Sequence, residues 1–455
     1  MADAVHFSRT MRTGVHAGFA IALAITGCAV DEEELELSTA EQMLGGHNGG
    51  LPSGIPVLNS FGFSTTVSTA PHGRIDLDNP FFQDLGTNDR RCVSCHLPTA
   101  GWSVTPEQLQ IAFVLTRGGQ FDDGLGIGAI FRPNDGTNSP NADVSTYKAR
   151  RSAYSMLLTR GTIRVGLPMP QGAEFDLVAV DDPYGFASAA ELSMFRRPLP
   201  STNLTLLPAA AAGPNVMWDG RVTGATVNAA LADQSNGATM GHAQRQTPLP
   251  QDVREQIVGL ETSLFTAQQH TNRMGTLTAE GAKGGADAVS KQTLVASRFN
   301  LFDSWAASTN AQRRAAFRGQ ELFNTRIRVG TTAGTCRACH SAENSGTNAN
   351  GAFFNVGTAD VERRSPDQPL YTFKNKTTLE EMSTTDPGRA LITGKWSDMK
   401  RFKTPSLRGL AARAPYFHGG SAKTLLDVVK LYEEELNFVF TEEEEKDLVA
   451  FMSAL

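Results

Sequence analysis

A Cys-x-x-Cys-His pentapeptide occurs twice in this chain, at residues 92–96 and 336–340, and takes four of its five cysteines. Two thiols at this spacing reach the two vinyl groups of one porphyrin, and the imidazole that follows lies under the iron. The attachment residues are Cys92, Cys95 and His96, then Cys336, Cys339 and His340. The repeat predicts two covalently bound c-type haems and a chain that folds around them.

Paired cysteines have two other common uses. Two pairs can bind one zinc ion as a ribbon, and each pair can be a dithiol redox couple. Neither use needs a histidine directly after both second cysteines, whereas haem attachment does. The sequence therefore favours haem, and a redox enzyme or an electron carrier.

The N-terminus has the form of a bacterial lipoprotein signal. Arg9 and Arg12 precede a short apolar run from 17 to 25, and small residues lead to Cys28. The run is too short to span a bilayer, and small residues are typical of a cleavage site. We expect residues 1–27 to be removed and Cys28 to be acylated; the alternative is an ordinary signal peptide that contains a cysteine.

Export agrees with the haem prediction, because c-type haem is attached outside the cytoplasm. The predicted location is the bacterial cell envelope, as a lipoprotein that faces the periplasm and touches the membrane only through its N-terminal lipid. Residues 28–55 are first acidic and then rich in glycine, which predicts a flexible tether.

About 400 residues follow the tether, enough for two domains with their own cores. One haem motif falls early in each half, which predicts an N-terminal domain over 56–290 and a C-terminal domain over 291–455. The apolar content of 40% is that of a soluble protein. The net charge of −6 is mild, and no basic stripe alternates with aromatic residues, so nucleic acid is not an expected partner.

Local patterns predict helices around the second haem motif. Residues 310–324 have helical apolar spacing, Thr424 opens an amphipathic segment, and a capping box at 441–444 precedes a closing helix. A helix before the motif and one after it is the layout of a cytochrome c domain. The first half is rich in glycine and proline, with a helix expected at 149–160 and a strand at 174–180. The predicted fold is mainly all-α: two cytochrome c-like domains, with long loops and little β-structure in the first.

Four further segments carry a family resemblance: Phe402–Arg408 (FKTPSLR), Ala414–Ser421 (APYFHGGS), Trp218–Arg221 (WDGR) and Asn79–Phe82 (NPFF). With both haem motifs in the same order, the chain resembles the bacterial di-haem cytochrome c peroxidases. It also resembles their relative MauG, which oxidises tryptophan residues of a partner protein.

The resemblance implies different tasks for the two haems. The first, with His96 as proximal ligand, would keep an open side where peroxide or oxygen reacts. The second, with His340, would be six-coordinate and store or supply an electron. Trp218 would lie between the haems and relay charge, unless it is only a well-packed core residue.

The second ligand of the second haem separates the subfamilies. Peroxidases place a methionine at the position of Tyr432, whereas MauG places a tyrosine, so the resemblance implies a MauG-type ligand. A phenolate oxygen favours ferric over ferrous iron. Tyr432 is otherwise one more residue on the apolar face of its helix, with Met399 as a reserve ligand.

One departure from the family concerns the chemistry of peroxide. Members that cleave peroxide usually carry a distal glutamate about twenty residues after the WDGR tryptophan, but residues 234–244 contain no carboxylate. Cleavage needs a group that takes a proton from one oxygen and returns it to the other. Gln234 and His242 are the candidates, and His242 is the better proton shuttle. His242 is alternatively a sixth ligand or a surface residue. The family often holds a calcium ion between its haems, for which Thr393 is a candidate ligand without a supporting acidic cluster.

The resemblance thus implies a peroxidase-class oxidoreductase with two covalently bound haem c groups. Hydrogen peroxide would be reduced at the first haem. Electrons would pass through the second, from a small redox protein such as a cytochrome c or cupredoxin, or from a partner protein that is oxidised. The alternatives are a di-haem oxygenase resembling the rubber oxygenases, and an electron-transfer cytochrome with both haems closed.

Overall fold

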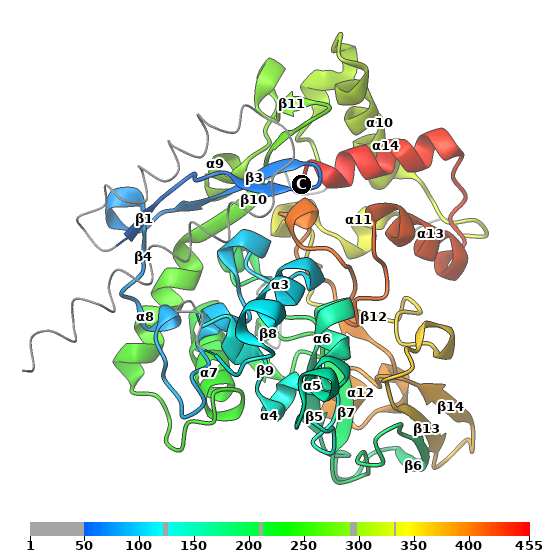
Figure 1. Cartoon of the computed structure of the whole chain (residues 1–455). Coiled ribbons are helices and arrows are strands. Elements are labelled where there is room, and N and C mark those ends of the chain that lie inside the picture. Colours follow the sequence, from blue (N-terminus) through cyan, green and yellow to red (C-terminus); the bar gives the residue numbers. More distant parts are fainter. Residues whose placement is uncertain (1–49, 122–125, 209–212, 292–297, 332–333) are drawn as a thin grey trace, which may run out of the picture.

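The computed structural model describes residues 50–121, 126–208, 213–291, 298–331 and 334–455 (Figure 1). The predicted signal peptide, Cys28 and most of the tether lie outside these ranges. Strand β1 (Gly50–Pro52) pairs with β4 (Arg74–Asp76), so regular structure begins within the segment assigned to the tether. None of the helices in the described ranges is long and apolar enough to cross a membrane.

The helices of the described ranges are spread over both halves of the chain. Their bounds are α3 (Pro106–Thr116), α4 (Pro133–Gly136), α5 (Tyr147–Ala153), α6 (Ser155–Arg160), α7 (Val227–Gly241), α8 (Gln251–Ser263), α9 (Ala286–Ser290), α10 (Ala311–Thr325), α11 (Cys336–Cys339), α12 (Ala390–Thr393), α13 (Leu425–Leu436) and α14 (Glu442–Ser453).

The strands form several small sheets between these helices. The largest has the order β11 (Gly275–Thr276), β10 (Leu264–Thr271), β3 (Gly62–Ser68), β2 (Val57–Asn59). A second combines β14 (Glu381–Thr384), β13 (Leu370–Asn375) and β6 (Phe175–Asp181). Two-stranded pairs are β1 with β4, β5 (Ile163–Leu167) with β7 (Leu192–Arg196), β8 (Asn215–Val216) with β9 (Val222–Thr223), and β12 (Phe353–Phe354) with β15 (Phe402–Lys403).

The expectation of a mainly all-α fold is wrong. The structure is 37% helical and 18% strand, a mixed α/β arrangement. Several strands could not be predicted from the residues next to them, because they are short and pair with distant segments. Strand β3, for example, pairs antiparallel with β10, about 200 residues later. No tight turn joins these strands, so the sequence carries no hairpin signal. Residues that looked like loops therefore gain their strand conformation from tertiary pairing.

The expected helices of the C-terminal half are confirmed. Asn310 caps α10, with its Oδ1 accepting from the backbone N–H of Gln312 at 2.8 Å. Thr424 and Thr441 open α13 and α14 as capping boxes. At Gly319 the backbone of α10 runs so close to α14 that an added Cβ would collide with the Asp447 carbonyl. The C-terminal helix thus closes directly over the helix that precedes the second haem motif (Figure 1).

The expectations for the first half hold in part. The strand expected at 174–180 is β6. The helix expected at 149–160 is interrupted at Tyr154, which separates α5 from α6. The Tyr154 ring is buried in edge contact with Phe131 at 5.4 Å between centroids, so core packing takes precedence over helix continuity.

The two halves of the chain are interwoven. Strand β6 of the first half adds to β13 of the second, from Leu370 opposite Asp181 to Asn375 opposite Phe175. The end of the chain returns to the first sheet, where the Leu455 carbonyl accepts from the Gln268 N–H at 3.3 Å. In Figure 1 the C-terminus accordingly lies against β3 and β10. The domain boundaries predicted from the sequence remain a proposal, and any two domains share this sheet.

Candidate haem sites

The first Cys-x-x-Cys-His motif folds into a single turn that begins at Cys92. The backbone N–H groups of Cys95 and His96 donate to the Cys92 carbonyl at 3.1 and 3.0 Å. Ser94 fixes this turn, because its hydroxyl accepts from the Arg91 N–H at 3.1 Å and donates to the Gly126 carbonyl. Both thiols and the imidazole consequently line one cavity.

Helices α7 and α8 form part of the wall of this first cavity. It has two adjoining parts, of about 70 and 150 Å³. The residues common to both parts are Cys95, His96, Gln234, Ala238, His242 and Glu261. Gln234 and His242, the candidates from the sequence, are thus brought to the same space as His96.

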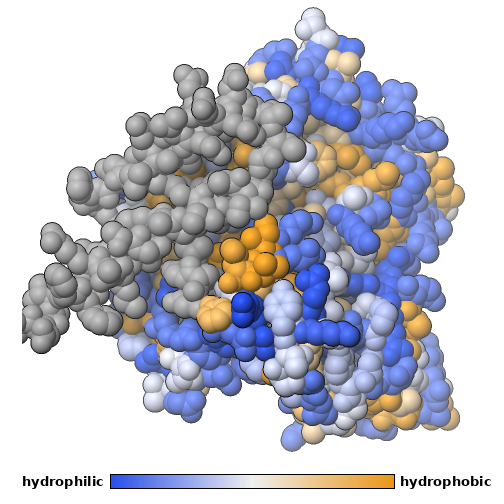
Figure 2. Space-filling model, in the orientation of Figure 1, coloured by the Kyte–Doolittle hydropathy of each residue, from blue (hydrophilic) through white to orange (hydrophobic). Residues whose placement is uncertain are grey.

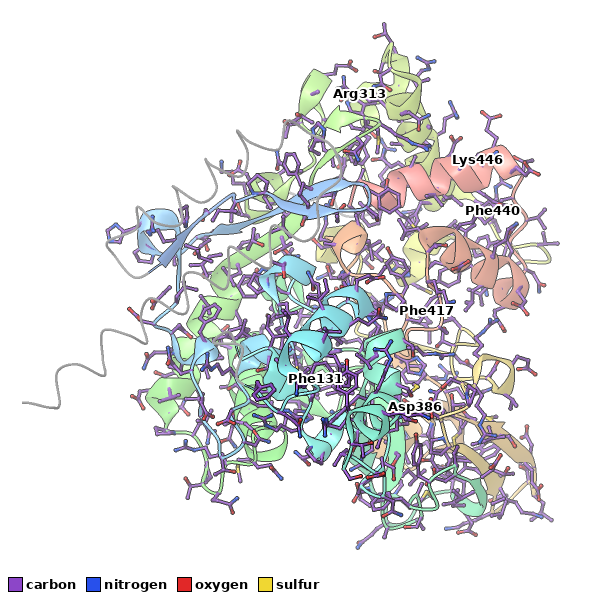
Figure 3. All side chains as sticks on the ribbon, in the orientation of Figure 1. Phe131, Arg313, Asp386, Phe417, Phe440 and Lys446 are labelled. Carbon is purple, nitrogen blue, oxygen red and sulfur yellow. The ribbon has the colours of Figure 1, made fainter. Side chains whose placement is uncertain are left out.

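The second motif forms a larger cavity of about 390 Å³. Cys336 and Cys339 lie at the two ends of α11, and His340 follows. Other parts of the wall come from α10, α13 and α14, and from the segments before and after α13 that contain Phe417 and Phe440, which Figure 3 labels. Tyr432 from α13 lies in this lining.

Each motif histidine is held in the tautomer that an iron ligand needs. His96 Nδ1–H donates to the Trp102 carbonyl at 3.2 Å, and His340 Nδ1–H donates to the Gly346 carbonyl at 2.9 Å. Burial lowers the pKa of both imidazoles to about 4, although these hydrogen bonds oppose the shift. Both are therefore neutral near pH 7, with Nε2 available as an acceptor.

Buried cations in and near the cavity walls fit a group with negative charges. Arg197, Lys403, Arg408 and Arg413 are buried, and none forms an ion pair with a carboxylate of the described ranges. Burial lowers the pKa of Lys403 to about 8 and that of Arg408 to about 10. Nε and Nη1 of Arg408 and Nε of Arg413 have no hydrogen-bond partner. Buried cations without counter-charges are costly, and haem propionates are anions of the right kind.

The zinc alternative for the cysteines is not supported by the structure. Within the described ranges no group of three or more His, Cys, Asp or Glu residues could hold a metal ion, so the cysteines do not form a zinc ribbon. Cys92, Cys95, Cys336 and Cys339 are all free thiols. The structure thus leaves both pairs open for attachment to a porphyrin.

Trp218 lines both cavities, as do Lys403 and Arg197. The indole is 9% exposed, and its Nε1–H donates to the Arg197 carbonyl at 2.8 Å. Its ring meets that of His418 edge-on, with 6.2 Å between centroids. The tryptophan therefore occupies the wall between the two candidate sites.

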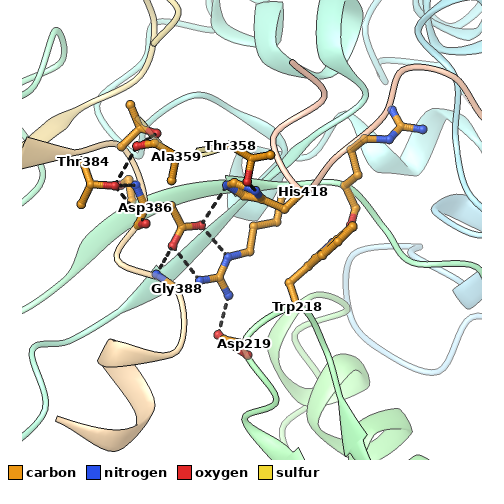
Figure 4. Close-up of polar contacts among 12 residues, drawn as sticks. Trp218, Asp219, Thr358, Ala359, Thr384, Asp386, Gly388 and His418 are labelled. Atoms are coloured by element: carbon orange, nitrogen blue, oxygen red, sulfur yellow. Dashed lines mark hydrogen bonds and ion pairs between the residues drawn. The ribbon is translucent and has the colours of Figure 1, made fainter. Parts of the chain in front are cut away.

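A buried charge network supports this wall (Figure 4). Arg196 donates to Asp386 from Nε and Nη2, at 2.7 and 2.9 Å, and also pairs with Asp219. Burial alone would raise the pKa of the Asp219 carboxyl, but Arg196 and Arg221 more than offset this and hold it below its usual range. The network fixes Asp219 and hence the neighbouring Trp218.

No family model matches the chain, but several characterised proteins do. A cytochrome c peroxidase of Denitromonas iodatirespirans is 33% identical over 175 residues, which are 34% of this chain and 44% of the relative. A second peroxidase of that organism is 29% identical over 254 residues, 52% of this chain and 64% of the relative. The methylamine utilization protein MauG of Methylophilus methylotrophus is 30% identical over 179 residues, 36% and 44% of the two chains.

The chain is thus similar, over parts of its length, to cytochrome c peroxidases and to MauG. It spans about half the length of the curated relatives that it matches. A solved MauG-like protein associated with microbial copper homeostasis has 16% identity and a TM-score of 0.33, over 76% of this chain and 88% of the other. The relationship rests on the sequence matches, and haem c is the cofactor that they imply.

His242 has a partner that the sequence did not reveal. It follows α7 directly, and its Nδ1–H donates to Asp135 Oδ2 at 2.8 Å. The His242 carbonyl accepts from Asn88 and Arg90, at 2.9 and 3.0 Å, which fixes the end of the helix. Nε2 is thus left as the acceptor in a cavity shared with His96. Asp135 is 107 residues away in a glycine-rich stretch, where no local pattern marks it.

Tyr432 shares the second cavity with His340, Cys336 and Cys339. Burial raises the pKa of its phenol above the ordinary value, so coordination to iron would have to remove the proton. Met399, the reserve ligand, is packed in a different cluster with Phe175 and Trp396. A methionine that does line the cavity is Met452 of α14, which the sequence marked only as an apolar helix residue.

Thr393 does not line either cavity. It ends α12, and its hydroxyl donates to Asp398 Oδ2 at 2.8 Å. Nothing in the described ranges strengthens the expectation of calcium at this residue.

Proposed function

We propose that this protein is a di-haem c-type peroxidase that reduces hydrogen peroxide in the cavity of His96. Electrons would come through the second site, from a small redox protein or from a partner protein that is oxidised. The observation that carries the proposal is the His242–Asp135 pair in that cavity. A cavity used only for electron transfer has no need of an oriented acid–base pair.

A haem held by Cys92, Cys95 and His96 would supply the redox-active iron. The residues of the chain orient and move protons around it. Peroxide enters beside His242, and Nε2 accepts the proton of the oxygen nearer to the metal. Asp135 accepts a hydrogen bond from Nδ1, so it holds the ring orientation and stabilises the imidazolium that forms. Gln234, on the same helix, would orient the peroxide by a hydrogen bond.

The second site would hold a haem on Cys336, Cys339 and His340, with Tyr432 as the other ligand. Trp218, in the wall between the sites, would relay charge. Arg197, Lys403 and Arg413, the buried cations that line the cavities, support bound haem because propionates would compensate their charges. Peroxidase relatives support peroxide and a redox protein as reactants.

The site in the cell is also a proposal. We infer a lipoprotein of the bacterial cell envelope that faces the periplasm and is acylated at Cys28. Maturation of c-type haem outside the cytoplasm supports this.

A second function has support from the same atom. If Nε2 of His242 bonded the iron directly, the first haem would be closed and the protein would be an electron carrier. An oxygenase has less support, because the first cavity carries an acid–base pair and is not purely apolar.

Rapid-mixing absorption spectroscopy of the haem-loaded protein tests the proposal. The ferric protein is mixed with hydrogen peroxide and the haem bands are followed, in the wild type and in His242→Ala. We expect a fast oxidation that His242→Ala slows by about 10²–10⁴-fold, the usual contribution of a positioned acid–base group. His72→Ala, which changes a histidine outside both cavities, is the matched control and should react like the wild type.

The alternatives give different results. A first haem that is six-coordinate in the wild type, and gains peroxide reactivity in His242→Ala, would identify an electron carrier. A wild type that is inert to peroxide but binds oxygen when reduced would identify an oxygenase.

A further inference from the structure

Glu261 is a buried carboxyl without a partner in the first cavity. Its side chain is 6% exposed, and Oε2 is buried without a hydrogen bond. It lines both parts of the cavity together with Gln234 and His242. It also lies close enough to Cys92 for its charge to raise the pKa of that thiol. The carboxyl is therefore next to the edge where a haem would be attached.

Glu261 occupies an apolar position of its helix. Ile257, Val258 and Leu260 are the other buried residues of this turn of α8, and a glutamate three or four residues after Ile257 and Val258 falls on the same face. Helix spacing thus points the carboxyl inward, among apolar neighbours. Burial raises its pKa to about 8.

Glu261 does not form the kind of ion pair that usually explains a buried carboxyl. Asp219 is equally buried, but two arginines compensate its charge. Glu261 forms no ion pair with a described cation. Arg90, which lines the same part of the cavity, donates to backbone carbonyls instead. An uncompensated carboxyl in an apolar wall costs stability, unless it stays protonated.

We propose that Glu261 is the acid that gives a proton to the leaving oxygen of hydrogen peroxide. This inference rests on the proposed peroxidase function and deepens it. The stretch 234–244 lacks a carboxylate, and Glu261 brings one into the same cavity from the next helix.

The proton balance requires a second group beside His242. The reaction is H₂O₂ + 2 e⁻ + 2 H⁺ → 2 H₂O, with the electrons supplied by the redox donor. Nε2 of His242 takes the proton of the near oxygen, and Glu261 gives its proton to the far oxygen. The O–O bond breaks, and the far oxygen leaves as the first water. His242 later returns its proton to the near oxygen, and solvent supplies one proton there and one to Glu261, so the second water forms and both groups are restored.

The test uses the haem-loaded full chain and Glu261→Gln, which keeps the shape of the side chain but has no acidic proton. The control is Glu255→Gln, an exposed position of the same helix. Infrared difference spectra between pH 7 and pH 10 should show the carbonyl band of a neutral carboxylic acid. The band should persist in the control and be absent from Glu261→Gln.

The kinetic arm repeats the rapid mixing with peroxide across pH. We expect the wild-type rate to fall above about pH 8, where Glu261 loses its proton. Glu261→Gln should be slower by about 10²-fold or more and lack this fall. Glu261→Asp keeps the acid and should recover part of the rate.

Each outcome is decisive. A reactive wild type with an equally fast Glu261→Gln, or with no carboxylic acid band, overturns the role of Glu261 and leaves the peroxidase proposal intact. A wild type that does not react with peroxide overturns both.

Discussion

Replacing Glu261 by glutamine should stabilise the haem-loaded protein, and most strongly at alkaline pH. The pKa of this carboxyl is about 8 in the folded protein, whereas an unfolded chain leaves a glutamate near 4.3. The folded state thus binds the proton more tightly. Below about pH 4 the carboxyl is protonated in both states and costs little. As the pH rises from about 4 to 8, the unfolded state gains the advantage of ionisation and the wild type loses stability.

The size of the effect follows from this difference. About four pH units correspond to about 5 kcal/mol above pH 8, which is an upper value because the chain relaxes around a buried charge. At about 2–4 °C per kcal/mol the melting temperature of Glu261→Gln should exceed that of the wild type by about 10–20 °C at pH 9. The two proteins should converge near pH 4.

Thermal unfolding followed by circular dichroism, from pH 4 to pH 9, measures this difference. Glu255→Gln on the exposed side of α8 should follow the wild type at every pH. A Glu261→Gln protein that is no more stable than the wild type at pH 9 would refute the reasoning, because Glu261 would then have a compensating partner in the folded state.

Three further predictions concern other parts of the site. Asp386→Asn leaves its buried arginine partner undercompensated and should cost about 3–5 kcal/mol in the free energy of unfolding; denaturant titration measures this, and the exposed Asp181→Asn should change little. Tyr432→Met should raise the potential of the second haem, on the order of 0.1 V within the roughly 0.8 V span of axial ligands; an unchanged potential in a spectroelectrochemical titration would exclude Tyr432 as a ligand. Asp135→Asn should slow the peroxide reaction by about 10²-fold, whereas a rate equal to that of the wild type would show that the pair is only structural.

The parts of the fold that the sequence predicts are those with local causes. The two haem motifs, the cap of α10 at Asn310 and the capping boxes of α13 and α14 depend on residues within four positions of each other. The pairings between distant strands, such as β3 with β10 and β6 with β13, have no such cause. Strand β7 (Leu192–Arg196) is buried along its whole length and pairs with β5. No local sequence pattern in either segment indicates which strand it pairs with. The sequence therefore overestimates helix where tertiary pairing decides.

The residues of the candidate site likewise include some that the sequence indicated and some that it did not. The sequence places His242 beside the first haem through the spacing after Trp218. Asp135, which accepts a hydrogen bond from His242, and Glu261, which lines the same cavity as His242, come from segments that no motif marks. Glu261 did leave one signal, a carboxylate on the apolar stripe of an otherwise amphipathic helix. The sequence therefore does contain a carboxylate that can reach the first cavity, although residues 234–244 have none.

An apolar patch is exposed on α3, outside the candidate haem sites. Val114 and Leu115 on α3 are 58% and 61% exposed, and Figure 2 shows an apolar cluster over this region. These two residues lie outside the lining of both cavities. If the protein reduces peroxide as proposed, the groups that would handle its protons are Glu261 and the His242–Asp135 pair. The two roles differ in their expected effect on stability. Loss of Glu261 should slow the reaction but stabilise the fold. Loss of Asp135 should slow the reaction and destabilise the fold, because it removes the hydrogen bond to His242.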